Sequence, residues 1–244
     1  MRMSVRLYAF PLAIALAIIS MLGALGVRPA QAQNLKTKYQ QMAPIAQYLM
    51  DRNAEIALAR SAAPRSVSAG ATVMVLGPEG YTTAVKGGNG FLCIVERSWG
   101  DATTDPGFWD PTIRGPICFN PAAATTFAPI YLIKTKLVLA GKSKQEIAQA
   151  LASAFNRKEL PALEPGAMCY MLSKQQSLND GPVNARHWHP HLMFFVSGDV
   201  AKSWGANLPG SPVIAVNDPE EQATIFMVLV SHWSDGTPAS QTAR

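Results

Sequence analysis

The first 32 residues most strongly limit what this chain can fold into, because they have the pattern of a segment that is removed. Arg2 and Arg6 precede an uncharged run, residues 7–27, that is rich in Ala, Leu and Ile. The sequence then reaches Ala30-Gln31-Ala32, the small-x-small pattern that signal peptidase cleaves. We therefore predict that residues 1–32 are a signal peptide cleaved after Ala32, and that the mature protein is periplasmic or secreted.

The alternative is that the same run stays in place as a membrane anchor, since about 20 apolar residues span a bilayer. Pro11, Gly23 and Gly26 oppose this alternative because they interrupt an apolar helix. The rest of the chain contains no second apolar run of that length. We therefore expect no stable membrane anchor after cleavage.

Cleavage of 32 residues leaves 212 of the 244, which is enough for one core and short for two. We predict a single globular domain over residues 33–244. The leader holds three of the 21 Lys and Arg and none of the 16 Asp and Glu, so the mature formal charge is +2. Because no dense basic run remains, nucleic acid is not an expected partner; a small molecule or another envelope protein is.

Short apolar runs between Gly- and Pro-rich turns predict strands, and longer periodic segments predict helices. The expected strands are residues 72–76, 81–86, 91–97, 167–173, 189–197, 212–216 and 224–232. An N-terminal helix is expected at residues 44–60, and a central pair at 122–140 and from Ser143 onward. Strand groups separated by a helix pair predict an α+β fold. We expect a largely antiparallel sheet of about six to seven strands with these helices packed on it.

Two local signals are more specific. Ser143 and Glu146 have the spacing of a capping box, in which each side chain satisfies a free backbone N–H. The segments 77–80 and 87–90 are Gly-rich turns between the first three strands. Because such short connections join antiparallel strands, they predict an antiparallel meander.

The three cysteines predict one disulfide in an oxidising compartment. Cys93 and Cys118 are the expected pair, because they flank residues 99–115, a segment rich in Gly, Pro and Asp that resembles a long irregular loop. A bridge at its base would limit the freedom of the unfolded chain. Cys169 lies in an apolar run, where a free thiol behaves as a small buried hydrophobe.

Three of the four histidines fall within five residues, at His187, His189 and His191. On an extended strand they share one face, and three imidazoles so placed can bind zinc or copper. His232 would join them if the last strand lies beside theirs, and Met and Cys donors from residues 167–172 would favour copper. The alternative is that the histidines end a strand, bonded to backbone or solvent.

The long loop contains Trp99, Phe108 and Trp109 among three Asp residues. This mixture predicts a surface that binds a small ligand or another protein. The alternative is that the Asp side chains hold turns together through the backbone.

Three functions therefore remain open. A binding or interaction module is favoured, because it requires no convergence of distant groups. A metal-binding protein or metalloenzyme would use His187, His189 and His191. A metal-free hydrolase would use Cys169 or a Ser, although the chain has no GxSxG or SxxK motif. The sequence leaves open whether the protein is an enzyme.

Overall fold

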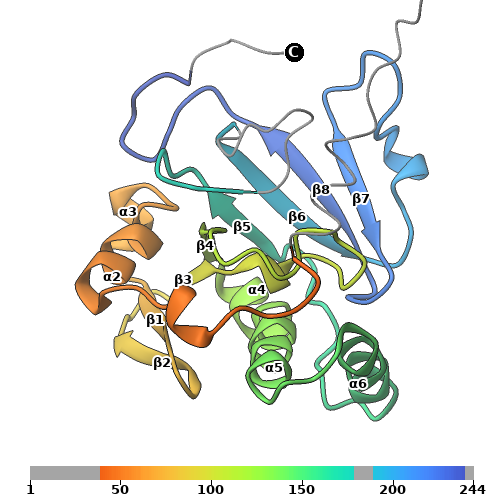
Figure 1. Cartoon of the computed structure of the whole chain (residues 1–244). Coiled ribbons are helices and arrows are strands. Elements are labelled where there is room, and N and C mark those ends of the chain that lie inside the picture. The colour runs from red at the N-terminus through yellow and green to blue at the C-terminus, as the bar shows by residue number, and fades with distance from the viewer. Residues whose placement is uncertain (1–38, 179–188, 240–244) are drawn as a thin grey trace, which may run out of the picture.

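The computed structural model describes residues 39–178 and 189–239, which form an eight-stranded sheet with helices packed against it (Figure 1). The strand order is β2-β1-β3-β4-β5-β6-β8-β7. The strands are β1 (Thr72–Gly77), β2 (Gly80–Val85), β3 (Leu92–Glu96), β4 (Gly115–Phe119), β5 (Met168–Met171), β6 (His191–Ser197), β7 (Ile214–Asp218) and β8 (Ala223–Leu229). All neighbours in this order pair antiparallel except β1 and β3. The α+β class and the largely antiparallel sheet are confirmed, with one strand more than expected.

The additional strand is β4, where the sequence shows only a brief apolar piece around Ile117. This strand lies between β3 and β5, and all five of its residues are buried. Its extended conformation therefore comes from pairing on both edges, which no local pattern encodes.

The first three strands are not the expected antiparallel meander. β1 and β2 form a hairpin, but β3 lies on the other side of β1 and runs parallel to it. The connecting residues 86–91 pass the start of β1 so closely that a Cβ on Gly87 would lie 2.2 Å from the backbone N of Thr72. Because β2 ends and β3 begins at the same end of the sheet, a short connection suffices without a full crossover. Glycine at position 87 makes this close approach possible.

The helices are α2 (Arg52–Arg60), α3 (Arg65–Ser68), α4 (Pro121–Thr126), α5 (Ala128–Leu139) and α6 (Lys144–Asn156). The N-terminal helix is shorter than expected, because Asp51 caps it by accepting hydrogen bonds from the N–H groups of Asn53 and Ala54. Residues 45–47 form only a short 3-10 turn.

The expected helix over residues 122–140 is interrupted at Phe127, which separates α4 from α5. Pro129 lies in the first turn of α5, where its missing N–H is tolerated but a continuous helix is not. The capping box of α6 is confirmed. The Glu146 carboxylate accepts a hydrogen bond from the Ser143 N–H at 2.8 Å, and the Ser143 hydroxyl accepts one from the Glu146 N–H at 3.3 Å.

Two helical layers cover opposite faces of the β1–β3–β4 part of the sheet (Figure 1). Helix α2 packs on the face that carries Cys93, Val95 and Cys118. Helices α4 and α5 pack on the face that carries Ile94 and Ile117. Cys93 and Cys118 are cross-strand partners joined by a disulfide with an S–S distance of 1.93 Å, and the buried Cys169 is the free cysteine.

The other half of the sheet, β5 to β7, is covered differently. On one face, residues 200–213 fold back so that Trp204 stacks on Phe226 of β8. On the opposite face lie the long loop (residues 97–114), which joins β3 to β4, and the first turn of α5. No helix in the described part of the chain is long and apolar enough to cross a membrane. The expected signal peptide lies outside the described residues.

Candidate functional site

A cavity of about 390 Å³ lies between this face of the sheet, the long loop and the β7–β8 turn (residues 219–222). Its apolar wall is built by side chains of four strands that share one face of the sheet: Ile117, Met171, Met193, Phe195, Ile225 and Met227. The rings of Phe195 and Phe127 are stacked with centroids 3.7 Å apart and continue this wall. Methionine and aromatic side chains give it a large and adaptable apolar surface.

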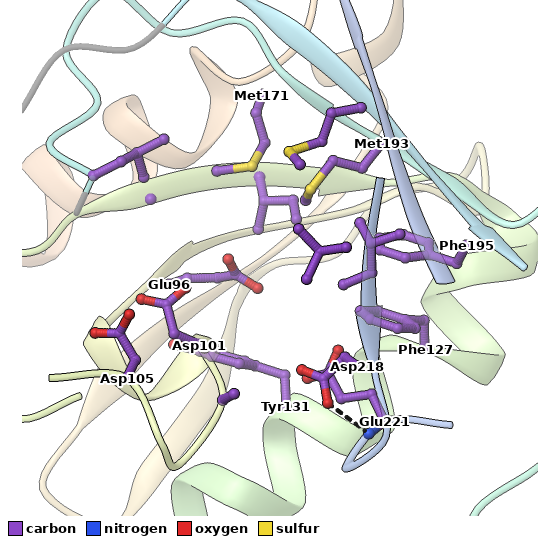
Figure 2. Close-up of a pocket in the computed structure, with 18 of the residues that line it drawn as sticks. Glu96, Asp101, Asp105, Phe127, Tyr131, Met171, Met193, Phe195, Asp218 and Glu221 are labelled. Carbon is purple, nitrogen blue, oxygen red and sulfur yellow. Dashed lines mark hydrogen bonds between the residues drawn. The ribbon is translucent and has the colours of Figure 1, made fainter. Parts of the chain in front are cut away.

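The opposite wall is acidic. Five carboxylic acids line the cavity: Glu96, Asp101, Asp105, Asp218 and Glu221. Figure 2 shows Met171 and Met193 across the cavity from Asp101 and Asp218. The cavity is therefore amphipathic, with an apolar side on β4, β5, β6 and β8 and a carboxylate side formed by the end of β3, the long loop, the end of β7 and the β7–β8 turn.

The long loop is fixed in place by hydrogen bonds to the core. The Trp99 indole N–H donates to Thr135 at 2.9 Å, and the Tyr48 hydroxyl donates to the Trp109 carbonyl at 2.7 Å. Asp105 and Asp110 each accept a hydrogen bond from the backbone N–H two residues ahead. The Asp residues thus shape the loop, as the alternative interpretation of the sequence states, and two of the loop's three also line the cavity.

The β7–β8 turn is attached to the long loop and to α5 by two neighbouring carboxylates. Glu220 accepts hydrogen bonds from the N–H and the hydroxyl of Thr103, at 3.1 and 2.6 Å. Glu221 accepts one from the Lys134 ammonium at 3.3 Å, and Lys134 also donates to the Asp101 carbonyl at 3.1 Å. Turn, loop and helix therefore meet at one end of the cavity.

The acidic surroundings change the ionisation of this pair. Burial, together with the charges of Asp218 and Glu220, raises the pKa of Glu221 to about 7, against the lowering effect of Lys134. Burial would lower the pKa of Lys134, but the carboxylates of Glu221, Asp218 and Glu220 outweigh it and raise that pKa. The two shifts differ in origin: the ammonium faces three carboxylates, whereas the Glu221 carboxylate faces one ammonium and two like charges.

We expect the raised pKa of Glu221 to make folding stability depend on pH. Between the ordinary pKa of 4.5 and the folded value of about 7, the folded state binds more protons than the unfolded state. The contribution of this group is fully present below pH 4.5 and is lost as the pH rises through 7. Between pH 5 and pH 8, the free energy of unfolding of the wild type should fall by about 1–3 kcal/mol more than that of Glu221→Gln. Urea unfolding at the two pH values measures both changes. A difference between the two proteins that stays constant with pH would contradict this expectation.

A buried polar network supports the wall behind the acids. Arg97 lines the cavity, but its guanidinium is bound to Glu55 at 2.9 Å and to the Tyr48 carbonyl at 2.7 Å. The Tyr131 hydroxyl accepts a hydrogen bond from the Arg97 N–H at 2.6 Å. Burial raises the pKa of Tyr131 well above its ordinary value, so this phenol is neutral. These groups hold the wall in place.

Of the predicted metal ligands, the structure places only His191 in the cavity. Its Nδ1 lies 2.8 Å from the His189 carbonyl, which assigns the hydrogen to Nδ1, and burial lowers its pKa to about 4. His232 is exposed and bonds Ser231. His187 lies outside the described residues. Within residues 39–178 and 189–239, no three His, Cys, Asp or Glu side chains are grouped to hold a metal ion. The zinc or copper hypothesis stays a prediction.

The predicted ligand-binding aromatics lie in the core. Trp99 and Phe108 are 0% exposed and Trp109 is 5% exposed, and none of the three lines the cavity. They anchor the long loop, so that its Asp101 and Asp105 face the cavity. Cys169 is also outside the lining, and burial raises its thiol pKa well above the ordinary value. At neutral pH this thiol is protonated, which makes it a poor nucleophile.

Several cavity residues were not singled out from the sequence, chiefly Glu96, Met193, Asp218 and Glu221. Only the Asp218-Pro219 pair gives a local signal, since Asp before Pro is typical of a turn. Asp218 does accept hydrogen bonds from the N–H groups of Glu220 and Glu221, at 2.8 and 3.1 Å. Figure 2 draws the second of these bonds as a dashed line.

The fold and the site define an α+β protein with a mixed apolar and acidic cavity on its sheet. No protein-family model, curated protein or solved structure matches the chain.

Proposed function

We propose that this protein is a binding module that holds a small molecule in the cavity between its sheet and the long loop. The observation that carries the proposal is the pairing of unlike walls, one of thioethers and aromatic rings and one of carboxylates. A volume of about 390 Å³ is within the range of small-molecule sites. The ligand has an apolar body that packs on the sheet and a polar end that reaches the acidic wall.

The rigidity of the walls supports binding without large rearrangement. The apolar wall belongs to hydrogen-bonded strands, and the long loop is attached to the core through Trp99 and Trp109. Methionine side chains supply the remaining adaptability, since they repack easily around different shapes. A preformed cavity with adjustable lining lowers the entropy cost of binding.

A bulky side chain at Met193 should block the cavity. Met193 lies on the cavity face of β6, whereas Val228 lies on the opposite face of the neighbouring β8 and is 37% exposed. We expect Met193→Trp to weaken binding of the neutral fluorescent probe N-phenyl-1-naphthylamine by about tenfold or more, a loss of about 1.4 kcal/mol. Val228→Trp, the matched control, should bind as the wild type does. Fluorescence titration measures both affinities.

Two results would count against the proposal. If the wild type takes up no such probe, the cavity does not admit apolar molecules. If Met193→Trp and Val228→Trp bind equally well, the probe occupies another surface.

We also propose that the domain is exported and that its leader is removed after Ala32. The Cys93–Cys118 disulfide supports export, because disulfides persist in oxidising compartments. The mature protein should then begin at Gln33, which N-terminal sequencing of material from the periplasm or medium would test. A protein that retains residues 1–32 there would rule out cleavage.

A further inference from the structure

We infer that the polar end of the ligand is an organic cation, an ammonium group carried on an apolar body. This inference rests on the proposed function, since it concerns the same cavity. It names the charge of the ligand, which the proposed function leaves open.

The lining of the cavity carries an excess of acidic side chains. Five acids line the cavity, and the only Lys or Arg among the described lining residues is Arg97. The Arg97 guanidinium is already paired with Glu55 behind the wall. In a partly enclosed site of low dielectric, an excess of carboxylates favours a ligand that brings positive charge and disfavours an anion.

Two largely buried carboxylates of the lining use only one of their two oxygens for hydrogen bonds within the described residues. Asp218 and Glu221 are each only 7% exposed. Asp218 uses Oδ1 for both amides of its turn, and Glu221 uses Oε1 for Lys134. The other oxygen of each carboxylate, Oδ2 and Oε2, accepts no hydrogen bond from the residues that the structure describes. Neither of these oxygens is one of the fully buried, unpartnered side-chain atoms of the described residues, so each is accessible to a ligand, and the N–H groups of an ammonium would supply it with a charged donor.

The acidic wall already stabilises one cation of the protein itself, the Lys134 ammonium. The Lys134 ammonium is buried beside this wall, and burial would lower its pKa. The carboxylates of Glu221, Asp218 and Glu220 nevertheless raise that pKa above the ordinary value. The wall therefore stabilises a positive charge in spite of the cost of desolvating it.

The arrangement fits an organic cation better than a bare metal ion. In the described parts of the chain, no three acidic, His or Cys side chains come together as a metal site requires. The acids are instead spread over the end of β3, the long loop, the end of β7 and the β7–β8 turn, facing Met193 and Phe195 across the cavity (Figure 2). An alkyl or aryl ammonium spans these walls, with its nitrogen near Asp218 and its body on the sheet.

Three probes with one phenylethyl body test the inference: 2-phenylethylammonium, 2-phenylethanol and 3-phenylpropionate. Calorimetric titration of the wild type at pH 8 should give an affinity for the ammonium about tenfold or more above that for the alcohol, with the propionate weakest. Raising the salt concentration from 20 to 300 mM should weaken only the ammonium complex appreciably. This comparison requires no variant, so it does not depend on the folding of a mutant.

The variant Asp218→Asn then locates the effect. It keeps an oxygen for the turn amides but removes the charge, so it should reduce the ammonium-to-alcohol preference severalfold, with most of the change in the ammonium affinity. Glu79→Gln, an exposed acid in the β1–β2 turn, is the matched control and should keep the full preference.

Each contrary outcome has a distinct meaning. Equal binding of ammonium and alcohol overturns the cation inference and leaves the proposed binding function standing. Calcium that binds more tightly than the ammonium and displaces it overturns the inference in favour of an inorganic ion. Failure of all three probes and of N-phenyl-1-naphthylamine overturns both the inference and the proposed function.

Discussion

Arg97→Met should lower the free energy of unfolding by about 3–5 kcal/mol, because it leaves a charge buried without its partner. The Arg97 side chain is fully buried, and its guanidinium donates to the Glu55 carboxylate and to the carbonyls of Tyr48 and Val95. These bonds join helix α2 to the end of β3, where the long loop begins. Without them the Glu55 carboxylate keeps only the Leu76 N–H, at 3.1 Å, as a donor. Urea unfolding at pH 7 measures the loss.

Two controls separate the buried pair from a general effect of removing an Arg. Arg157→Met removes an exposed ion pair with Glu159, and we expect no measurable change in the free energy of unfolding. Adding Glu55→Gln to Arg97→Met should restore part of the lost stability, because the uncompensated charge disappears while an amide oxygen still accepts the Leu76 N–H. A loss for Arg97→Met no greater than that for Arg157→Met would show that the buried pair does not hold α2 in place.

Local signals predicted the class of the fold because each of them acts within a few residues. The capping box of α6 joins positions three apart, and the Gly-rich turn after β1 closes a hairpin directly. Alternation along β6 sends Met193 to one face and Phe194 to the other, as the strand pattern requires. Such features need no knowledge of the remaining chain.

Sheet order was not predictable in the same way, since it depends on partners far along the chain. β4 is extended because β3 and β5 lie on either side of it, and β3 runs parallel to β1 because Gly87 lets the connection pass the edge of β1 closely. A Gly-rich segment looks the same in sequence whether it closes a hairpin or passes the end of a strand. The meander expectation failed for this reason.

The candidate site was likewise predicted only in part from the sequence. The sequence pointed to the long loop, and two of its three acids, Asp101 and Asp105, do line the cavity. It assigned the binding role to Trp99, Phe108 and Trp109, but these rings face the core. Composition does not reveal which side of a loop is buried, so an aromatic that anchors a loop cannot be distinguished from one that binds a ligand. Asp218 and Glu221 joined the site only through the pairing of β7 with β8 and of β8 with β6.

Removal of the Cys93–Cys118 disulfide should lower the free energy of unfolding about as much as Arg97→Met does. Cys93 and Cys118 are 25 residues apart, and the loop they close contains the whole of the long loop. Chain-entropy arguments give about 3.5 kcal/mol for a loop of this length, because the bridge restricts the unfolded chain. We therefore expect the double variant Cys93→Ala, Cys118→Ala to lose about 3–4 kcal/mol of unfolding free energy in urea.

Two controls separate the effect of losing the cross-link from the effect of removing buried Cys side chains. Cys169→Ala changes a buried thiol on the other face of the sheet and should cost only about 1 kcal/mol. Reductant during unfolding should bring the wild-type midpoint down toward that of the double variant while leaving the double variant unchanged. If reductant leaves the urea midpoint of the wild type unchanged, the disulfide does not stabilise the protein. A double variant with unchanged stability but weaker probe binding would instead mean that the bridge acts on the folded long loop.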